Sequence, residues 1–421
     1  MASPRASWAW VPTLYFAEGL PYVLVVIVSS VMFRQLGISV ADVTLYTSWL
    51  YLPWVIKPFW SPFVDLVKTK RWWLLITQII LGAGLAGVGL TLNTGNFFRW
   101  SLIIMWLLAF SSATHDISID GFYMLGLDEG EQSLFVGIRN TAYRIAMIAG
   151  QGGLLILVGL FEKLFGSTVR AWSLGFMIAG GIMILLWLYH SYILPHPVAD
   201  CTTGVSGKNI LKEFGMTFVS YFKKPYIIPA LLFILLFRFP EAQLGKIAPL
   251  FLIDPTEAGG LGLTTGEIGF AQGTLGVIGL LLGGILGGIT LSRFGLRKCI
   301  WYMVAAISVP DLVYVYLSWM PTQNMALVSS CIFIEQMGYG FGFTAYTLFL
   351  MYFARGEHQT SHYAISTGIM ALGMMLPGMI SGMLQESMGY RTFFIWVIAC
   401  CAVTCVVSAL IKYEPDFGKK Q

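Results

Sequence analysis

Residues 72–92 read WWLLITQIILGAGLAGVGLTL, a segment without a charged side chain. Folded as an α-helix with a rise of 1.5 Å per residue, it is about 31 Å long and matches the hydrocarbon core of a bilayer. The basic segment Lys68-Thr-Lys-Arg71 precedes it directly. Together these features predict a transmembrane helix that starts at the cytoplasmic surface, where lysine and arginine concentrate.

The whole chain has the composition of a membrane protein. Of its 421 residues, 57% are hydrophobic and 11% are charged, whereas an ordinary soluble domain has about 25% charged residues. The apolar segments are about 20 residues long, whereas a transmembrane barrel needs alternating strands of about ten residues. The composition therefore excludes a water-soluble domain and a barrel, and it predicts several membrane-spanning helices.

Twelve apolar segments predict an all-α membrane protein with twelve transmembrane helices in two six-helix bundles. The long polar segment 195–225 reads as a cytoplasmic linker between an amino-terminal bundle, residues 1–194, and a carboxy-terminal bundle, residues 226–421. The predicted spans are 8–31, 43–66, 72–92, 99–125, 134–160, 171–194, 226–253, 264–291, 298–320, 324–353, 361–387 and 391–412.

Basic residues outside the spans indicate the orientation of the chain. An even number of spans puts both termini on one side, which then carries fifteen lysines and arginines against five on the other. Cytoplasmic loops are the basic ones, so both termini are expected in the cytoplasm. The six cysteines lack metal-ligand spacing and are expected to pack as apolar side chains. We expect no metal, no cofactor and no nucleic-acid partner, and we expect a monomer.

The two halves resemble each other at a nearly constant offset. Gly37-Ile-Ser-Val-Ala-Asp-Val and Gly262-Leu-Thr-Thr-Gly-Glu-Ile both lie near the start of the second span of their half. Arg170-Ala-Trp and Arg391-Thr-Phe open the last span of each half. Such a parallel duplication indicates the major facilitator architecture, in which a substrate binds near the midplane between the halves. Spans 1, 4, 7 and 10 line the cavity of that fold.

Ionisable residues concentrate in these four spans. They are costly in a membrane and mark functional sites or internal ion pairs. Asp116 and Asp120 are four residues apart on one helix face, where each disfavours ionisation of the other. Either they relay protons or they form fixed ion pairs with Arg139 or Arg144, and both roles can coexist. The candidates for proton coupling are Asp116 and Asp120 in span 4, Glu18 in span 1 and Glu335 in span 10.

Other polar residues within spans are candidates for substrate binding. Arg144 and Gln151 share a stripe of span 5, and a guanidinium suits a carboxylate or phosphate. Arg238 and Glu241 either neutralise each other or bind substrate. Lys57, Pro58 and Asp65 at the end of span 2 indicate a gating hinge. The predicted substrate-binding residues are Arg144, Arg238, Glu241, Gln151, Tyr123, Tyr339 and Gln336.

Glycines recur in two spans of the second half. They allow two helices to approach closely, so they predict helix packing and not a nucleotide-binding loop. They are Gly276, Gly279, Gly283, Gly284, Gly287 and Gly288 in span 8 and Gly338, Gly340 and Gly342 in span 10.

Five segments resemble the AmpG-like muropeptide permeases, whose pattern is shared in part by the acetyl-CoA transporters. They are Phe16-Ala-Glu-Gly-Leu-Pro21, Lys57-Pro-Phe-Trp-Ser-Pro-Phe-Val-Asp65, Ala113-Thr-His-Asp-Ile-Ser-Ile-Asp120, Tyr143-Arg-Ile-Ala-Met147 and Glu335-Gln-Met-Gly-Tyr-Gly-Phe-Gly342. The resemblance implies a multi-pass protein of the bacterial inner (cytoplasmic) membrane and proton symport. It also implies roles for Asp116, Asp120, Arg144 and Lys57.

The expected function is therefore proton-coupled import of a muropeptide or a related amino sugar or oligosaccharide by alternating access. One alternative is a transporter of an acyl-CoA or another anionic conjugate, which would need more cations facing the cavity. A second is a membrane receptor of the same fold that binds without transport. An enzyme is not expected, because the five histidines form no cluster suited to catalysis.

Overall fold

The computed structural model describes residues 4–197, 200, 207–356 and 359–414, and all regular structure in these ranges is helical. Some side chains inside helices, including that of Asp65, lie outside the described set. Contacts divide the chain into two units, Met1–Leu36 with Ile56–Leu211 (unit 1) and Gly37–Val55 with Lys212–Gln421 (unit 2). Residues Gly37–Val55 thus group with the later part of the chain. The predicted domain limits of 1–194 and 226–421 remain a prediction.

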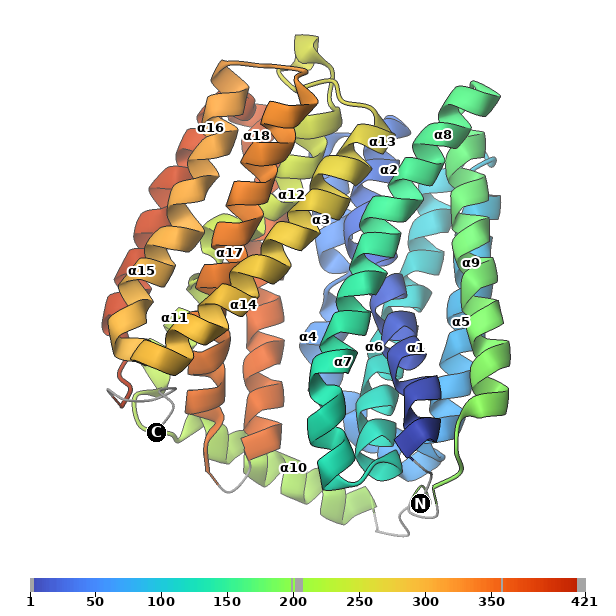
Figure 1. Cartoon of the computed structure of the whole chain (residues 1–421), viewed down its shortest axis with the longest axis vertical. Coiled ribbons are helices and arrows are strands. Elements are labelled where there is room, and N and C mark those ends of the chain that lie inside the picture. Colours follow the sequence, from blue (N-terminus) through green and yellow to red (C-terminus); the bar gives the residue numbers. More distant parts are fainter. Residues whose placement is uncertain (1–3, 198–199, 201–206, 357–358, 415–421) are drawn as a thin grey trace. The chain divides into compact units, whose positions relative to one another are not determined.

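Unit 1 is a bundle in which α5 lies beside α6 and α9, and α1 lies beside α7 (Figure 1). α4 (Leu52–Val67) begins in unit 2 and continues into unit 1. The other segments of unit 1 are α1 (Pro4–Val23), the π-helical turn η1 (Leu24–Val28), α2 (Ser29–Gln35), α5 (Lys70–Thr91), α6 (Phe97–Gly126), α7 (Glu129–Met147), the π-helical turn η2 (Ile148–Leu154), α8 (Leu155–Phe165) and α9 (Thr168–Ile193).

Unit 2 is also helical, and α18 packs on α3, α11 and α12. α10 (Gly207–Phe222) links the two units. The other segments of unit 2 are α3 (Val40–Trp49), α11 (Ile227–Leu236), α12 (Phe239–Ile253), the 3-10 turn η3 (Thr256–Ala258), α13 (Thr265–Ile268), the π-helical turn η4 (Gly269–Gly276), α14 (Val277–Phe294), α15 (Leu296–Ser308), the 3-10 turn η5 (Val309–Asp311), α16 (Leu312–Trp319), α17 (Met325–Ala354) and α18 (Gln359–Leu410).

Each of the twelve predicted spans coincides with helix. In the part of the chain that the structure describes, nine helices are long and apolar enough to cross a membrane, and one of them, His362–Leu410, has 49 residues. This helix holds two predicted spans, because Gly389 has a φ of 73° and ends the helical path between them. α3 with α4, and α17, account for the remaining two spans. The predicted fold class is confirmed.

The repeated motif at the start of the second span has the same structure in both places. The side chain of Ser39 accepts a hydrogen bond from the backbone N–H of Asp42 at 3.1 Å, and Thr264 accepts one from that of Glu267 at 3.3 Å. Both are N-caps, which satisfy a backbone donor left over in the first helical turn. The offset between the two caps equals that of the sequence repeat, which supports the predicted duplication.

The glycines of α14 and α17 hold these two helices in close contact. A Cβ atom on Gly283 would overlap the carbonyl oxygen of Met337, and one on Gly340 would overlap that of Leu280. A Cβ on Gly279 would lie 2.6 Å from the carbonyl oxygen of Phe333. The predicted packing role is confirmed for these positions. Gly288, in contrast, faces open space.

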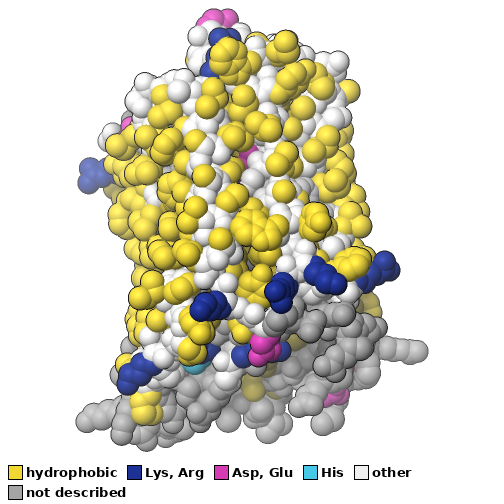
Figure 2. Space-filling view, turned by 90° about the vertical axis from the view of Figure 1, so that its left-hand side faces the viewer, with side chains coloured by type: hydrophobic (Ala, Val, Ile, Leu, Met, Phe, Trp, Pro, Cys, Tyr) yellow, Lys and Arg dark blue, Asp and Glu magenta, His cyan; other side chains and the backbone are white. Residues whose placement is uncertain are grey.

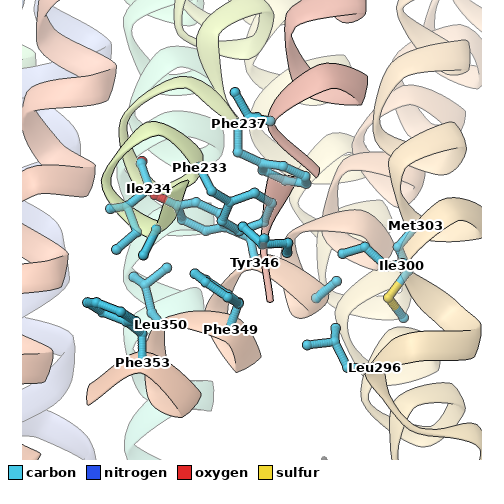
Figure 3. Packing of buried hydrophobic residues seen from close by; sticks show 14 of the residues in the cluster. Phe233, Ile234, Phe237, Leu296, Ile300, Met303, Tyr346, Phe349, Leu350 and Phe353 are labelled. Carbon is cyan, nitrogen blue, oxygen red and sulfur yellow. The ribbon is translucent and has the colours of Figure 1, made fainter. Parts of the chain in front are cut away.

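Apolar side chains fill the interior and also cover the outside. An aromatic cluster in unit 2 includes Phe233, Phe237, Tyr346 and Phe349 (Figure 3), and the rings of Phe237 and Tyr346 stack 5.2 Å apart. On the face shown in Figure 2, hydrophobic side chains predominate, and lysine and arginine side chains gather toward one end. Such an apolar exterior suits helices that face lipid.

The predicted linker contains α10, whose carboxy-terminal end is anchored on unit 2. Tyr221 is fully buried, and its hydroxyl lies 2.8 Å from that of Ser366 in α18. Ser220 contacts the Nε2 of His362 at 2.9 Å. Burial raises the pKa of Tyr221 to about 12 because the phenolate would lose its hydration.

Candidate functional site

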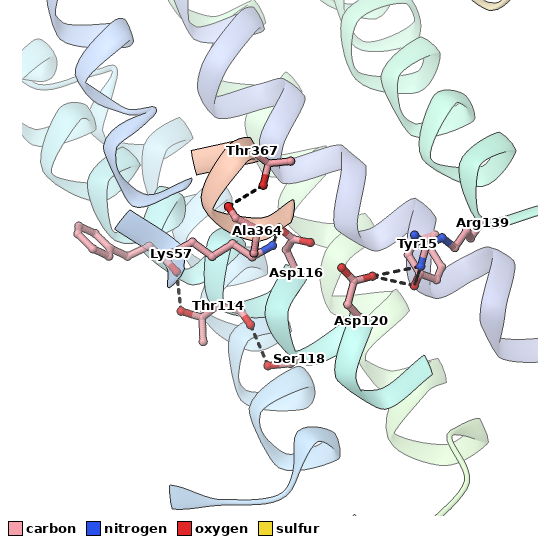
Figure 4. Close-up of polar contacts among 10 residues, drawn as sticks. Tyr15, Lys57, Thr114, Asp116, Ser118, Asp120, Arg139, Ala364 and Thr367 are labelled. Atoms are coloured by element: carbon pink, nitrogen blue, oxygen red, sulfur yellow. Dashed lines mark hydrogen bonds and ion pairs between the residues drawn. The ribbon is translucent and has the colours of Figure 1, made fainter. Parts of the chain in front are cut away.

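A charged cluster lies between α1, α4, α6 and α7 of unit 1. Asp116 and Asp120 both project from α6, one helical turn apart. Lys57 of α4 forms an ion pair with Asp116, as Figure 4 shows. The side chains of Lys57 and Asp116 are 28% and 19% exposed, so the pair is partly withdrawn from water.

Asp120 has a different set of partners (Figure 4). Its Oδ1 accepts hydrogen bonds from the hydroxyl of Tyr15 at 3.1 Å and from Arg139 Nη1 at 3.4 Å. Arg139 Nη1 also donates to the Tyr15 hydroxyl at 3.1 Å. The guanidinium carbon of Arg139 lies 5.2 Å from the ring centres of Tyr15 and Tyr123. Arg139 is therefore held by charge, hydrogen bonding and cation–π contact together.

Glu18 of α1 adds a third acid. Its buried carboxyl group lies against that of Asp116, Oε2 has no other hydrogen-bond partner among the described residues, and Asp116, Asp120 and Lys57 all act on it electrostatically. We call Glu18, Lys57, Asp116, Asp120 and Arg139 the unit 1 charge cluster. Three acids and two bases leave this cluster one positive charge short of neutrality, which a proton on one carboxyl group would supply.

The ion-pair alternative of the sequence analysis holds for one of its two arginines. Arg139 pairs with Asp120, but the partner of Asp116 is Lys57. Arg144 has no carboxylate within ion-pair distance in the described part of the chain, and its Nη1 donates to the Sδ of Met147 at 3.2 Å. One turn of helix between Met147 and Arg144 explains this contact.

The other candidates of unit 1 are distributed around this cluster. Gln151 is buried in the π-helical turn η2, on the same helical path as Arg144. The hydroxyl of Tyr123 donates to the backbone carbonyl of Gln132, so it is already satisfied within the protein. Pro58 lies inside α4 next to Lys57, and its carbonyl accepts a hydrogen bond from Ser61 at 3.2 Å. The side chain of Asp65 lies outside the described residues.

The candidates of unit 2 surround Arg238, at the break between α11 and α12. Arg238 Nη2 donates to the hydroxyl of Tyr339, and its guanidinium lies 4.8 Å from the ring centre of Phe343. Its Nε has no hydrogen-bond partner among the described residues. Arg238 and Glu241 interact electrostatically but form no ion pair in the described part of the chain, so they do not simply neutralise each other.

Glu241, Glu335 and Gln336 lie near Asp311, an acid within the ninth span that was not among the predicted site residues. Gln336 Nε2 donates to Glu335 Oε2 at 3.0 Å, and carboxylate oxygens of Glu241, Asp311 and Glu335 come within 4.8 Å of one another. An acid beside Pro310 in the middle of an apolar span was the available signal. The sequence shows a spacing along the chain, however, and not that three helices bring their acids together.

Lys246 was also without a predicted role. Its Nζ donates to the hydroxyl of Thr47 in α3 at 3.0 Å and lies 5.2 Å from the ring centre of Tyr51. All three residues belong to unit 2. Their contact explains how a lysine is accommodated in an apolar span, because the ammonium group has polar and aromatic partners there.

Comparison with known proteins identifies the sequence relatives. The model of the Major Facilitator Superfamily matches residues 13–376. The chain is 26% identical to the "Anhydromuropeptide permease" of Escherichia coli (strain K12) over 415 residues, which cover 96% of this chain and 80% of the permease. It is 25% identical to the "Putative transporter AmpG 4" of Rickettsia conorii, with 91% of each chain covered.

Solved structures of transporters share the fold. The nucleoside transporter NupG has a TM-score of 0.70 at 17% identity, with 98% of this chain and 100% of that chain covered. A D-xylose-proton symporter has a TM-score of 0.74 at 11% identity, with both chains covered completely. At such low identity these likenesses establish the architecture and leave the substrate open.

Proposed function

Since the chain belongs to the Major Facilitator Superfamily, we propose that it is a proton-coupled transporter that imports a muropeptide or a related amino sugar or oligosaccharide. It is a multi-pass membrane transporter, and its likeness to AmpG permeases extends over almost the whole chain. The names of these relatives support the substrate class. The proposed location is the bacterial inner membrane, with both termini in the cytoplasm.

The observation that carries the proton-coupling proposal is the unit 1 charge cluster. Asp116 and Asp120 lie one turn apart but depend on different cations, Lys57 and Arg139. Protonation of Asp116 would release Lys57, and protonation of Asp120 would weaken the contacts to Arg139 and Tyr15. A proton that moves from one carboxyl group to the other would therefore change which ion pair is intact, the one between α4 and α6 or the one between α6 and α7. This is the coupling that a symporter needs.

We assign substrate binding to groups with unused or exchangeable polar atoms. Among the described residues, the Arg144 guanidinium donates a hydrogen bond to the sulfur of Met147, and Arg238 Nε has no hydrogen-bond partner beside two aromatic rings. A guanidinium at either place suits the carboxylates of a peptide stem, and aromatic faces suit sugar rings. The proposed supporting residues are Gln151, Tyr123, Tyr339, Gln336 and Glu241, and the proposed gating residues are Lys57, Pro58 and Asp65.

Uptake of labelled anhydro-muropeptide into proteoliposomes tests this proposal. We expect wild-type uptake to rise with an inward proton gradient, and Asp116→Asn and Asp120→Asn to abolish this rise. Glu414→Gln, which changes an exposed acid paired with Arg355, is the matched control and should transport normally.

Three results would contradict parts of the proposal. Uptake that ignores the gradient would refute proton coupling, and uptake of acetyl-CoA without muropeptide would refute the substrate class. Binding of muropeptide without any uptake would indicate a receptor of the same fold.

A further inference from the structure

Three acids from separate segments converge in unit 2. Glu241 lies in the first turn of α12, Asp311 ends the 3-10 turn η5, and Glu335 lies within α17. Each offers a carboxylate oxygen, and these oxygens all lie within 4.8 Å of one another. The three residues are 7%, 2% and 2% exposed. We call them the carboxylate triad.

Arg238 acts electrostatically on Glu241 of the triad without forming an ion pair with it in the described part of the chain. None of the three acids is in an ion pair within the described ranges, Arg238 donates to Tyr339, and Lys246 donates to Thr47. Glu241 and Asp311 interact with each other, and outside the triad Glu241 Oε1 and Asp311 Oδ1 have no hydrogen-bond partner among the described residues. Buried carboxylates this close repel one another, so the triad requires a positive charge between its members.

A phenol hydroxyl points independently to a ligand at this place. Tyr314 of α16 is 1% exposed, and its hydroxyl faces Glu335 of the triad and has no other hydrogen-bond partner in the described part of the chain. The charged groups that act on it are Glu335, Asp311 and Glu241. A buried hydroxyl is unfavourable unless its hydrogen-bonding capacity is used, and an oxygen-binding ligand within the triad would use the free lone pairs of this oxygen.

We propose that the carboxylate triad binds a hard metal cation, with Tyr314 as a neutral supporting oxygen. Oxygen ligands of one such ion are at most about 4–5 Å apart, since metal–oxygen distances are about 2.0–2.6 Å. The spacing of the triad fits this range. Three carboxylates with Arg238 beside them carry two negative charges, so a divalent ion gives a neutral site, as an apolar interior requires. Carboxylates select Mg²⁺, Ca²⁺ and Mn²⁺ over softer ions.

This inference goes beyond the proposed transport function, because it concerns ion binding by the protein without substrate. The test measures Mn²⁺ binding to the purified full-length protein by electron paramagnetic resonance, and binding of radioactive Ca²⁺ and Na⁺ by scintillation proximity. Wild type should bind Mn²⁺ or Ca²⁺, and it should bind the monovalent Na⁺ more weakly. Each of Glu241→Gln, Asp311→Asn and Glu335→Gln should lower the affinity at least about tenfold.

Two further variants separate a binding defect from a folding defect. Glu18→Gln neutralises a buried acid of unit 1 and should bind the ion like wild type. Tyr314→Phe keeps the ring and removes only the hydroxyl, so it should weaken binding without lowering the unfolding temperature measured in the absence of the ion.

The proposal is overturned if wild type binds neither Mn²⁺ nor Ca²⁺, which would mean that protons or a monovalent ion neutralise the triad. It is also overturned if the bound ion is retained in all three carboxylate variants. Either result leaves muropeptide uptake untouched, so failure here is distinct from failure of the proposed function.

Discussion

At the scale of single residues, Lys57 and Asp116 stabilise each other because each would otherwise be a partly buried charge without a partner. Removing one partner from a fully buried ion pair costs about 3–5 kcal/mol, while replacing both can be neutral. The two side chains retain 28% and 19% exposure, so the cost of a single replacement should be lower here.

We therefore expect Lys57→Met and Asp116→Asn each to lower the free energy of unfolding by about 1–3 kcal/mol. The double variant should be less destabilised than the sum of the two, because neither charge is then left alone. Unfolding of the purified variants in detergent measures this. Additive effects would mean that the ion pair does not contribute to stability.

Arg139 makes contacts that only a planar guanidinium can make together. Arg139→Lys keeps the positive charge. It loses the planar group that stacks on Tyr15 and Tyr123 and that directs a hydrogen bond to Asp120. We expect at least about a tenfold loss of gradient-driven uptake, equal to about 1.4 kcal/mol. Tyr15→Phe, which removes the hydroxyl bound to Asp120, should show part of this loss. Normal uptake by Arg139→Lys would show that charge alone suffices.

The residue types of the site could be predicted from the sequence, but not their pairing. Acids and bases within apolar spans stand out because membranes exclude them. Which base meets which acid depends on helix rotation and crossing, so Arg144 was a possible partner of the aspartates and Lys57 was taken for a hinge residue. The triad partner Asp311 was missed for the same reason.

At the scale of helices, glycine spacing on α14 distinguishes a packed face from an outer face. Gly283→Ala should lower the free energy of unfolding by about 1–3 kcal/mol, because the new methyl group meets the backbone of Met337. Gly288→Ala is the matched control on the same helix and should be neutral or slightly stabilising, since alanine favours helix. Equal unfolding temperatures for the two variants would contradict the close packing of α14 and α17.

The anchor of α10 predicts a response to alkaline pH. The pKa of Tyr221 is raised to about 12, against about 10 in an unfolded chain. The folded protein therefore holds the phenol proton more tightly, and this stabilisation is present below pH about 10 and lost as the pH rises to about 12. The unfolding temperature of wild type should fall in this pH window more steeply than that of Tyr221→Phe. Tyr192→Phe, at a side chain 92% exposed, should follow wild type.

Most helices could be predicted from apolar length alone, whereas their internal breaks could not. The π-helical turns η1, η2 and η4 and the 3-10 turn η5 lie inside predicted spans. Local packing and proline residues cause these turns, and a count of hydrophobic residues does not predict them.

At the scale of the whole molecule, the distribution of lysine and arginine predicts that both termini are cytoplasmic. A green fluorescent protein fused to the carboxy terminus should fluoresce in cells, and alkaline phosphatase fused at the same place should be inactive. Active phosphatase would mean that the predicted orientation is wrong.

The sequence by itself determined that this is a twelve-helix membrane protein of duplicated plan, because bilayer thickness converts apolar length directly into spans. It also determined which ionisable side chains lie within spans, where their cost in lipid indicates an ion pair or a functional site. Only the tertiary structure decided that Asp116 meets Lys57, that Asp120 meets Arg139, and that Glu241, Asp311 and Glu335 converge. The physical reason is that charge pairing acts over a few ångströms between helices, and these distances arise from packing between residues far apart in the chain.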